Sequence, residues 1–207
     1  MLIKSISFFS ILTIMISCNA KQPHSKIEIE IDSMASIDQA IIAKIENSTF
    51  PDREDLLSEQ QSILRENTLR AKGILKEFGY PGTDKVSKET STNFWLIVQH
   101  SDHDIEFQKE VLSILAKEVK LGHALVIDYA YLLDRVRVNE GLPQIYGTQV
   151  YYDSLNNPQP KNVENPDGLD SIRKSVGLEP ISQYLQLLKA SRLKVGDTIK
   201  GNFIITN

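Results

Sequence analysis

The chain has 207 residues, of which 41% are hydrophobic and 24% are charged, and its formal net charge is −4 with a pI of about 5.6. This ordinary globular composition excludes a collagen, a coiled-coil rod and a wholly disordered chain. The acidic balance gives no sign of nucleic-acid binding, which usually shows a basic patch and a high pI. Because Cys18 is the only cysteine, an internal disulfide and a cysteine zinc site are also excluded.

The first 17 residues have the pattern of an export signal. Lys4 supplies a positive charge, and the apolar run from Ile6 to Ile16 is shorter than the roughly 20 residues that a membrane-spanning helix needs. The alternative is a buried core helix, but such a helix rarely begins at the first residue of a chain with no polar face. We therefore predict a signal peptide over residues 1–17.

Cys18 directly follows this segment and precedes a polar stretch over residues 19–22. The arrangement resembles a bacterial lipoprotein signal, although Met15 replaces the usual leucine and Ile16 the usual small residue. The resemblance implies that Cys18 is acylated, with palmitate as an expected modification, and becomes the mature N-terminus. Each buried methylene contributes about 0.8 kcal/mol, so several acyl chains hold a soluble domain at a membrane. We expect a bacterial cell-envelope protein, lipid-anchored to the outer membrane and facing the periplasm or the surface.

The body of the chain reads mainly as helix. Residues 18–33 are expected to hold the lipidated cysteine, a tether and a short strand, because isoleucines and acids alternate strictly over residues 26–32. The β-rich segment 202–206 is the hypothetical partner of that strand. From Met34 onward the apolar period becomes helical, and the inward-facing set is expected to include Ile37, Leu57 and Leu69. The first five helices are expected to begin near residue 34 and then to cover residues 55–78, 87–99, 104–121 and 123–139.

Residues 141–166 interrupt this helical pattern. They contain four prolines and four asparagines, and their apolar residues suggest a short hairpin. Two brief helices, over residues 167–175 and 181–191, are expected to follow. The predicted fold class is therefore mainly α: a single helical domain over residues 34–207, with a hairpin or irregular segment after the fifth helix and a small pair of terminal strands.

The segment QHSDHD, residues 99–104, is the first candidate for chemistry. If it were helical, His100 and His103 would be neighbours on one face and could hold a metal ion. A zinc site needs three or four ligands, however, and Asp102 or Asp104 is also a natural N-cap for the next helix. We favour the capping interpretation, so that His100 and His103 remain a weak metal candidate and no metal or cofactor is predicted.

Two further segments carry polar residues close to the helix end at residue 139. Asp134 and Arg135 could form part of an exposed charged face, or could turn toward the following loop. That loop, GLPQIYGTQ over residues 141–149, could be a binding site or a structural loop whose glutamines satisfy buried backbone groups. The chain has no nucleophile elbow, P-loop or dinucleotide fingerprint.

Several short segments together resemble a bacterial group known as domain of unknown function 6624, over a family-like core of about residues 37–184. The resemblance implies a mostly helical domain and implies no activity. Asn162, Asn165 and Ile172 depart from the family pattern, where proline, aspartate and arginine are usual. The matching segments are Asp38-Gln39, Phe78-Gly79-Tyr80-Pro81, Trp95 with Val98-Gln99-His100, Leu133-Asp134-Arg135-Val136, the stretch from Gly141 to Gln149, and the stretch from Asn162 to Leu178.

The polar residues within the matching segments could converge on one pocket or could pin the loop against the helices. On the favoured hypothesis the protein is a membrane-tethered lipoprotein that binds an unknown small molecule or protein. On the alternative it is a hydrolase-like enzyme in which His100 is the general base, Asp134 orients it, and Arg135 or Arg173 holds an anionic group. Whether the protein is an enzyme stays open at this point. The candidate catalytic residues are thus His100, Asp134 and Arg135, and the candidate ligand-binding residues are Gln99, Gln144, Tyr146, Thr148, Gln149 and Arg173.

Overall fold

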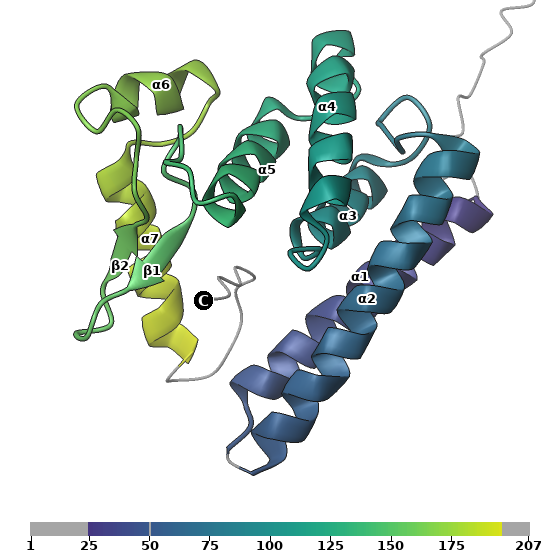
Figure 1. The fold of residues 1–207 in the computed structure, drawn as a ribbon, viewed down its shortest axis with the longest axis horizontal. Helices are drawn as coiled ribbons and strands as arrows, with labels where there is room; N and C mark the ends of the chain where they lie inside the picture. The colour runs from purple at the N-terminus through teal and green to yellow at the C-terminus, as the bar shows by residue number, and fades with distance from the viewer. Residues whose placement is uncertain (1–24, 50, 196–207) are drawn as a thin grey trace, which may run out of the picture.

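The computed structural model describes residues 25–49 and 51–195, with side chains up to residue 191. The fold is mainly α, as predicted, with a small antiparallel sheet after the fifth helix (Figure 1). The proposed partner strand at residues 202–206 and the leader at residues 1–17 lie outside the described residues. The elements are α1 (Lys26–Glu46), α2 (Asp52–Phe78), α3 (Lys88–Gln99), α4 (Ile105–Leu121), α5 (Val126–Asn139), β1 (Val150–Tyr152), β2 (Pro158–Pro160), α6 (Leu169–Ser175) and α7 (Ile181–Val195).

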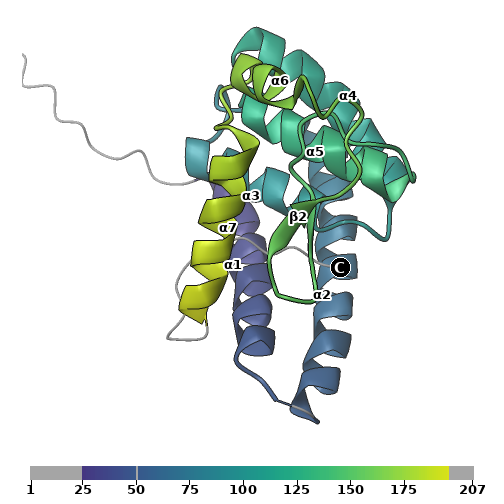
Figure 2. The same cartoon turned by 90° about the vertical axis from the view of Figure 1, so that its left-hand side faces the viewer.

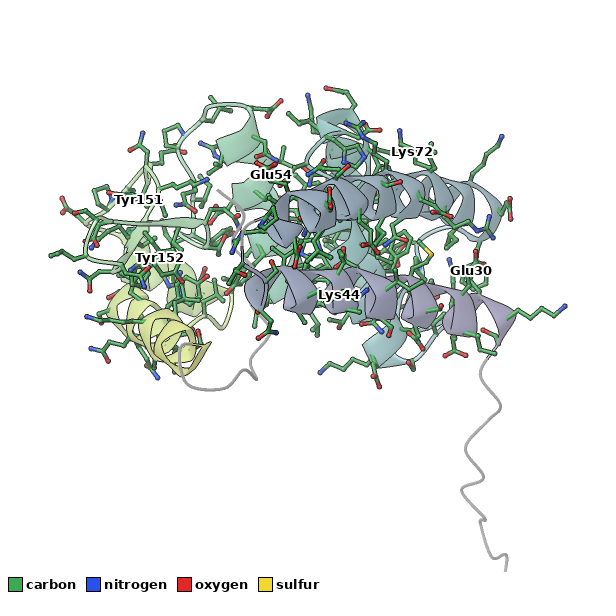
Figure 3. All side chains as sticks on the ribbon, turned by 90° about the horizontal axis from the view of Figure 1, so that it is seen from below. Glu30, Lys44, Glu54, Lys72, Tyr151 and Tyr152 are labelled. Atoms are coloured by element: carbon green, nitrogen blue, oxygen red, sulfur yellow. The ribbon has the colours of Figure 1, made fainter. Side chains whose placement is uncertain are left out.

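The helices form two groups joined through α3 and α5. Helices α1 and α2 make a long antiparallel hairpin, in which Glu30 near the start of α1 lies close to the C-terminal half of α2 (Figure 3). Helix α3 packs on both helices of this hairpin, and α4 pairs with α5. The strands, α6 and α7 lie on the far side of α5 from the hairpin, and β1 pairs with β2 from Val150 opposite Pro160 to Tyr152 opposite Pro158 (Figures 1 and 2).

The strand predicted at residues 26–32 is wrong, because this segment is the first part of α1. Ser25 and Glu28 form a capping box: the Ser25 hydroxyl accepts from the Glu28 N–H, and the Glu28 carboxylate accepts from the Ser25 N–H. The isoleucine spacing fits a helix as well as a strand, since Ile31 is fully buried while Ile29 is 61% exposed. The capping box of Ser25 and Glu28 therefore predicts a helix start, but the alternation of isoleucines and acids also fits a strand.

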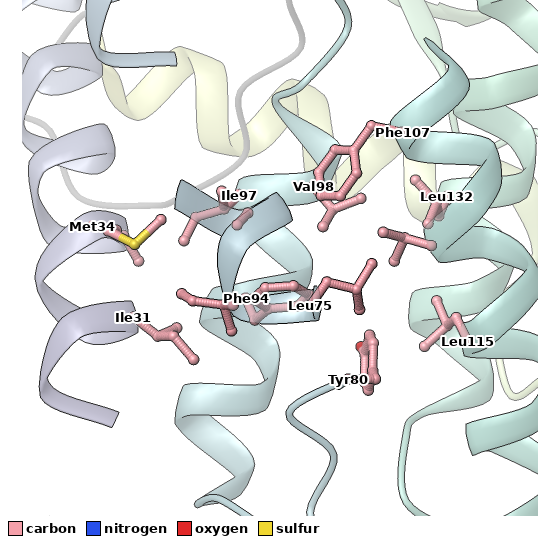
Figure 4. Close-up of a cluster of buried hydrophobic side chains, with 14 of the residues drawn as sticks. Ile31, Met34, Leu75, Tyr80, Phe94, Ile97, Val98, Phe107, Leu115 and Leu132 are labelled. Carbon is pink, nitrogen blue, oxygen red and sulfur yellow. The ribbon is translucent and has the colours of Figure 1, made fainter. Parts of the chain in front are cut away.

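One continuous apolar core joins the first five helices (Figure 4). Phe94 of α3 lies at its centre with no exposed surface, and its ring meets the Tyr80 ring edge-on at 5.6 Å between centroids. An aromatic chain from Trp95 through Tyr131 to Tyr184 then links α3 and α5 to α7. The buried members of the core are Ile31, Met34, Ala35, Ala71, Ile74, Leu75, Tyr80, Phe94, Ile97, Val98, Phe107, Val111, Leu115, Leu132 and Val136.

Three apolar residues expected to face inward are exposed instead. Ile37 is 50%, Leu57 41% and Leu69 71% exposed. Each long helix of the hairpin buries one stripe, and these three residues lie off that stripe. Ile37 and Leu69 line a shallow groove between α1 and α2, so helical periodicity alone overestimated the buried face of the hairpin.

Helix α5 begins at Val126, three residues later than predicted, and places Asp128 in its first turn. The side chain is 6% exposed, and burial raises the pKa of Asp128 to about 6, although the positive charge of Lys88 opposes the rise. The backbone carbonyl of Asp128 accepts a 2.9 Å bond from the Trp95 indole N–H, which fixes this turn against α3. The folded state therefore favours the protonated form of the Asp128 carboxyl group.

We predict that Asp128→Asn stabilises the protein at pH 7.5 and that this gain shrinks as the pH falls below 6. The folded state binds a proton that the unfolded state has released between about pH 4 and pH 6, so stability is lost as pH rises through that window. The loss corresponds to about 1–3 kcal/mol above pH 6. Urea unfolding of both proteins from pH 4.5 to 8 tests this, with exposed Glu110→Gln as the matched control. A gain that is the same at every pH contradicts the prediction.

Candidate functional site

Asp134 of α5 anchors the loop that follows its helix. The side chain has no exposed surface, and its two oxygens accept bonds from the backbone N–H groups of Ile145 (2.7 Å), Tyr146 (3.0 and 3.1 Å) and Thr148 (2.9 Å). The hydroxyl of Thr148 donates a further bond of 2.9 Å. Bonds from N–H and O–H groups to an ionised carboxylate are stronger than neutral ones. Every hydrogen bond to Asp134 in the described structure therefore comes from the loop, so this residue fixes the loop and does not orient His100.

Gln144, which lies within the same loop, also holds it in place through its side chain. Its amide nitrogen donates to the carbonyl groups of Gln149 and Lys161, both at 2.8 Å, and its amide oxygen accepts from the Gln149 N–H at 2.8 Å. Its backbone also pairs with residues 162–164 through a bridge to Val163. Because Gln144 is fully buried, these bonds replace the water that its amide and the loop backbone would otherwise need.

Arg173 of α6 reaches into the same network and likewise contacts backbone atoms. Its Nε donates to the Glu179 carbonyl at 2.7 Å and its Nη1 to the Tyr146 carbonyl at 2.6 Å. The guanidinium lies 4.9 Å from the ring centroid of Tyr184, whose hydroxyl donates to the Thr148 carbonyl at 2.9 Å. Burial raises the pKa of Tyr184, so this hydroxyl remains a donor. Arg173 is fully buried and supports the loop through Nε and Nη1, whereas its Nη2 has no hydrogen-bond partner among the described residues.

These residues form one unit, here called the loop network: Asp134, Gln144, Thr148, Arg173 and Tyr184. Of the residues expected to bind a ligand, Gln144, Thr148 and Arg173 belong to it through their side chains, and Tyr146 belongs to it through its backbone. Gly147 has φ of +66° inside this loop, and a Cβ there would lie 3.3 Å from Leu169. Its left-handed backbone lets the chain turn within reach of Asp134.

Arg135 pairs with Asp102 at the turn between α3 and α4. Its Nε and Nη2 contact the two carboxylate oxygens at 2.7 and 2.5 Å, and its Nη1 donates to the Gln149 side-chain oxygen at 3.3 Å. Burial would raise the pKa of Asp102, but the bonds and charge of Arg135, with Asn139 and Gln108, hold it below its ordinary value. The Arg135 guanidinium is thus committed to a carboxylate of the chain, and Gln149 joins this pair to the loop.

His100 pairs with a residue that sequence reasoning did not select as a site residue. Its Nδ1 lies 2.7 Å from Oδ2 of Asp38 in α1, and the Gln39 amide donates to the same oxygen at 3.0 Å. Asp38 is 1% exposed, whereas the His100 side chain keeps 10% of its surface. Since an ionised carboxylate only accepts, Nδ1 would be the donor in this pair. Asp38 lay within a matching segment, but its distance from His100 in the sequence hid the pairing.

Four buried side-chain atoms of the described residues lack a hydrogen-bond partner: Oδ1 of Asp38, the amide nitrogen of Gln99, the Tyr80 hydroxyl and Nη2 of Arg173. The first belongs to this pair, and the second belongs to the residue that precedes His100 in the chain. Gln99 is 4% exposed. Asp38, Gln99 and His100 are here called the junction cluster, because they lie where the end of α3 meets α1. The cluster offers an oriented imidazole, an acceptor and a donor, which can bind a polar group or move a proton.

The capping interpretation of residues 99–104 is confirmed. Helix α3 ends at Gln99, His100 is its C-cap, and Asp104 caps α4 by accepting from the Phe107 N–H at 3.1 Å. His100 and His103 therefore lie on a turn and do not share a helix face. Within the described ranges, the group of three residues with metal-ligand geometry lies elsewhere and includes neither of them.

We predict that Asp134→Asn destabilises the protein strongly, because the amide replaces a charged acceptor of four donors and presents its own N–H groups to the loop. The expected loss is about 3–5 kcal/mol, equivalent to a fall in Tm of roughly 10 °C. Calorimetry of the variant beside Asp167→Asn, an exposed acid that should change stability by less than about 0.5 kcal/mol, provides the measurement. Equal Tm values for the two variants would contradict the anchoring role.

The chain was also compared with known proteins. Residues 25–196 match the model of a family of unknown function, DUF6624. No curated protein and no solved structure matches the chain. The matched range contains both the loop network and the junction cluster, and it covers most of the chain. The chain therefore belongs to the DUF6624 family.

Proposed function

We propose that this protein is a lipid-anchored binding protein of the bacterial cell envelope that takes a polar small molecule or a polar group of a protein partner at the junction cluster. The anchor would be Cys18, exposed after removal of residues 1–17, because the leader pattern and the single cysteine fit a lipoprotein signal. In the part of the chain that the structure describes, no helix is long and apolar enough to cross a bilayer. An acylated N-terminus would supply the membrane contact.

The two unpartnered atoms of the junction cluster carry the binding proposal. Buried polar groups in proteins nearly always have partners, so an acceptor on Asp38 and a donor on Gln99 without them call for a ligand or an ordered water. In the loop network the side chains of Asp134 and Gln144 are engaged by the chain, and only Nη2 of Arg173 lacks a partner among the described residues. The junction cluster differs in that its two unpartnered atoms belong to an acceptor and a donor near an imidazole that keeps some exposed surface.

A second candidate function is a hydrolase-like enzyme in which His100 is the general base and Asp38, in place of Asp134, orients it. The 2.7 Å contact between Nδ1 and a buried carboxylate favours it, because this arrangement fixes the tautomer that presents Nε2. The two arginines that were expected to hold an anionic group, Arg135 and Arg173, do not support this function. Arg173 binds backbone carbonyls in the interior and Arg135 binds Asp102, so neither is placed to hold a substrate. Binding is therefore the better supported function.

We predict opposite effects for one substitution at two buried glutamines. Gln99→Met removes an unpartnered amide and should leave Tm unchanged or raise it, since sites kept for a ligand reduce stability. Gln144→Met has the same change in shape but breaks three bonds and should lower Tm by roughly 5–10 °C. Thermal unfolding of both variants is the measurement. A comparable fall for Gln99→Met would show that its amide is structural and would remove the main support for the binding site.

The anchor is tested separately by mass spectrometry of the protein from its native host. We expect a mature chain that begins at Cys18 and carries the mass of acyl chains, and we expect it in the membrane fraction. The control is Cys18→Ser, which should carry no acyl mass and leave that fraction. An unmodified product that still begins at Met1 would overturn the cellular location.

A further inference from the structure

A second polar group lies at the other end of α4 from the junction cluster, at the turn between α4 and α5. It consists of Glu118 in the last turn of α4, His123 just after that helix, and Asp84 in the connection between α2 and α3. Nδ1 of His123 lies 3.0 Å from Oε2 of Glu118 and 3.6 Å from Oδ1 of Asp84. One ligand atom from each residue lies within 4.8 Å of the other two. The fold thus brings three metal-binding side chains together from separate segments.

The spacing of these atoms suits a metal ion. Zinc binds imidazole nitrogen and carboxylate oxygen at about 2.0–2.2 Å, and a tetrahedral arrangement then separates neighbouring ligand atoms by roughly 3.3–3.5 Å. The two distances from His123 Nδ1, 3.0 and 3.6 Å, lie on either side of this range. Side-chain adjustments of a few tenths of an ångström would therefore bring these two pairs to coordination distance. No movement of the backbone is needed for that change.

The backbone around the three residues is already fixed. Thr83 donates both its N–H (2.8 Å) and its hydroxyl (3.2 Å) to the carbonyl of His123, and the His123 N–H donates to the Glu118 carbonyl at 2.9 Å. At Gly82 a Cβ would lie 2.7 Å from Oδ1 of Asp84 and 3.0 Å from the His123 carbonyl, so only glycine allows this approach. These contacts use main-chain atoms of His123, while its imidazole contacts the Glu118 carboxylate through Nδ1.

The charges and exposure of the group favour a cation. Two carboxylates face one imidazole, and the side chains of Asp84, Glu118 and His123 retain 33%, 20% and 34% of their surface. An ion can therefore reach them from solvent and keep water in its remaining positions. In the absence of an ion, the His123 ring would donate to Glu118 through the Nδ1 proton, and a metal at Nδ1 would replace that proton. An imidazole ligand favours zinc and similar transition metals over Mg²⁺ and Ca²⁺, which prefer oxygen.

We propose that Asp84, Glu118 and His123 form a binding site for a first-row divalent transition metal ion, with Zn²⁺ as the reference ion and water completing its coordination. The ion would join the α2–α3 connection to the end of α4, near the point where Thr83 already donates to the His123 carbonyl. The site is separate from the junction cluster, and the proposal does not depend on the binding function proposed above.

The test is a titration of tag-free, chelator-treated protein with Zn²⁺, followed by isothermal calorimetry and by Tm. We expect about one zinc ion per chain and a rise in Tm with Zn²⁺ that Mg²⁺ does not reproduce. Asp84→Asn and His123→Gln should weaken binding by more than about tenfold and abolish the rise. His103→Gln and Glu106→Gln change the same residue types outside the site and should bind as the wild type does.

The variants should fold, because the contacts that hold the connection in place use the backbone of His123. If His123→Gln nevertheless fails to fold, Glu118→Gln and Asp84→Asn provide the same comparison. The proposal is overturned if the wild type binds no zinc, if Asp84→Asn and Glu118→Gln bind as tightly as the wild type, or if only His103→Gln loses the ion.

Discussion

The buried carboxylate of Asp134 is the interaction on which the C-terminal third of the structure depends. A fully buried charge would be very unfavourable alone, and four donors from the 145–148 loop compensate for it. The loop leads directly into β1, where Val150 packs against Tyr184 and Leu188 of α7. The Tyr184 hydroxyl also donates to the Thr148 carbonyl within the loop. Arg173 closes the same unit from α6. The side chain that the sequence suggested as the partner of a catalytic histidine thus holds a loop in place.

This assignment changes the meaning of the matching polar residues. A cluster of His, Asp and Arg in a sequence suggests one site, but the structure separates them by what their atoms contact. Asp134 and Arg173 contact main-chain groups, which any protein must satisfy when it buries an irregular segment. His100 contacts a side chain and lies beside groups that the described chain leaves unsatisfied. Arg173 also keeps one nitrogen without a partner, so the contrast between the two groups lies in the side-chain pair of His100 and Asp38.

The extent to which the sequence could predict this arrangement depends on the range of each interaction. Local signals sufficed for the helices, because the apolar period, the Asp104 cap and glycines such as Gly122 act within a few residues. The segment 26–32 failed because strand and helix patterns coincide over seven residues, and the capping box at Ser25 was the deciding signal. The Asp38–His100 pair spans 62 residues, and no periodicity reports such a contact. The group around His123 was missed for the same reason, since Asp84 comes from another segment.

Glu28 and Asp32 lie in the segment of α1 that was predicted as a strand, and their hydrogen bonds to α3 explain why His100 lies next to Asp38. Glu28 accepts from the Ser87 N–H at the start of α3, and Asp32 accepts from Thr90 and Asn93 one turn later. These bonds show that α1 and α3 run parallel, and they fix the register between the two helices. In this register Asp38 lies next to His100 at the other end of α3. Ile31 and Met34 of α1 and Phe94 of α3 belong to the same buried core, which supports this register. The pair is therefore positioned by the packing of two helices and not by its own hydrogen bond.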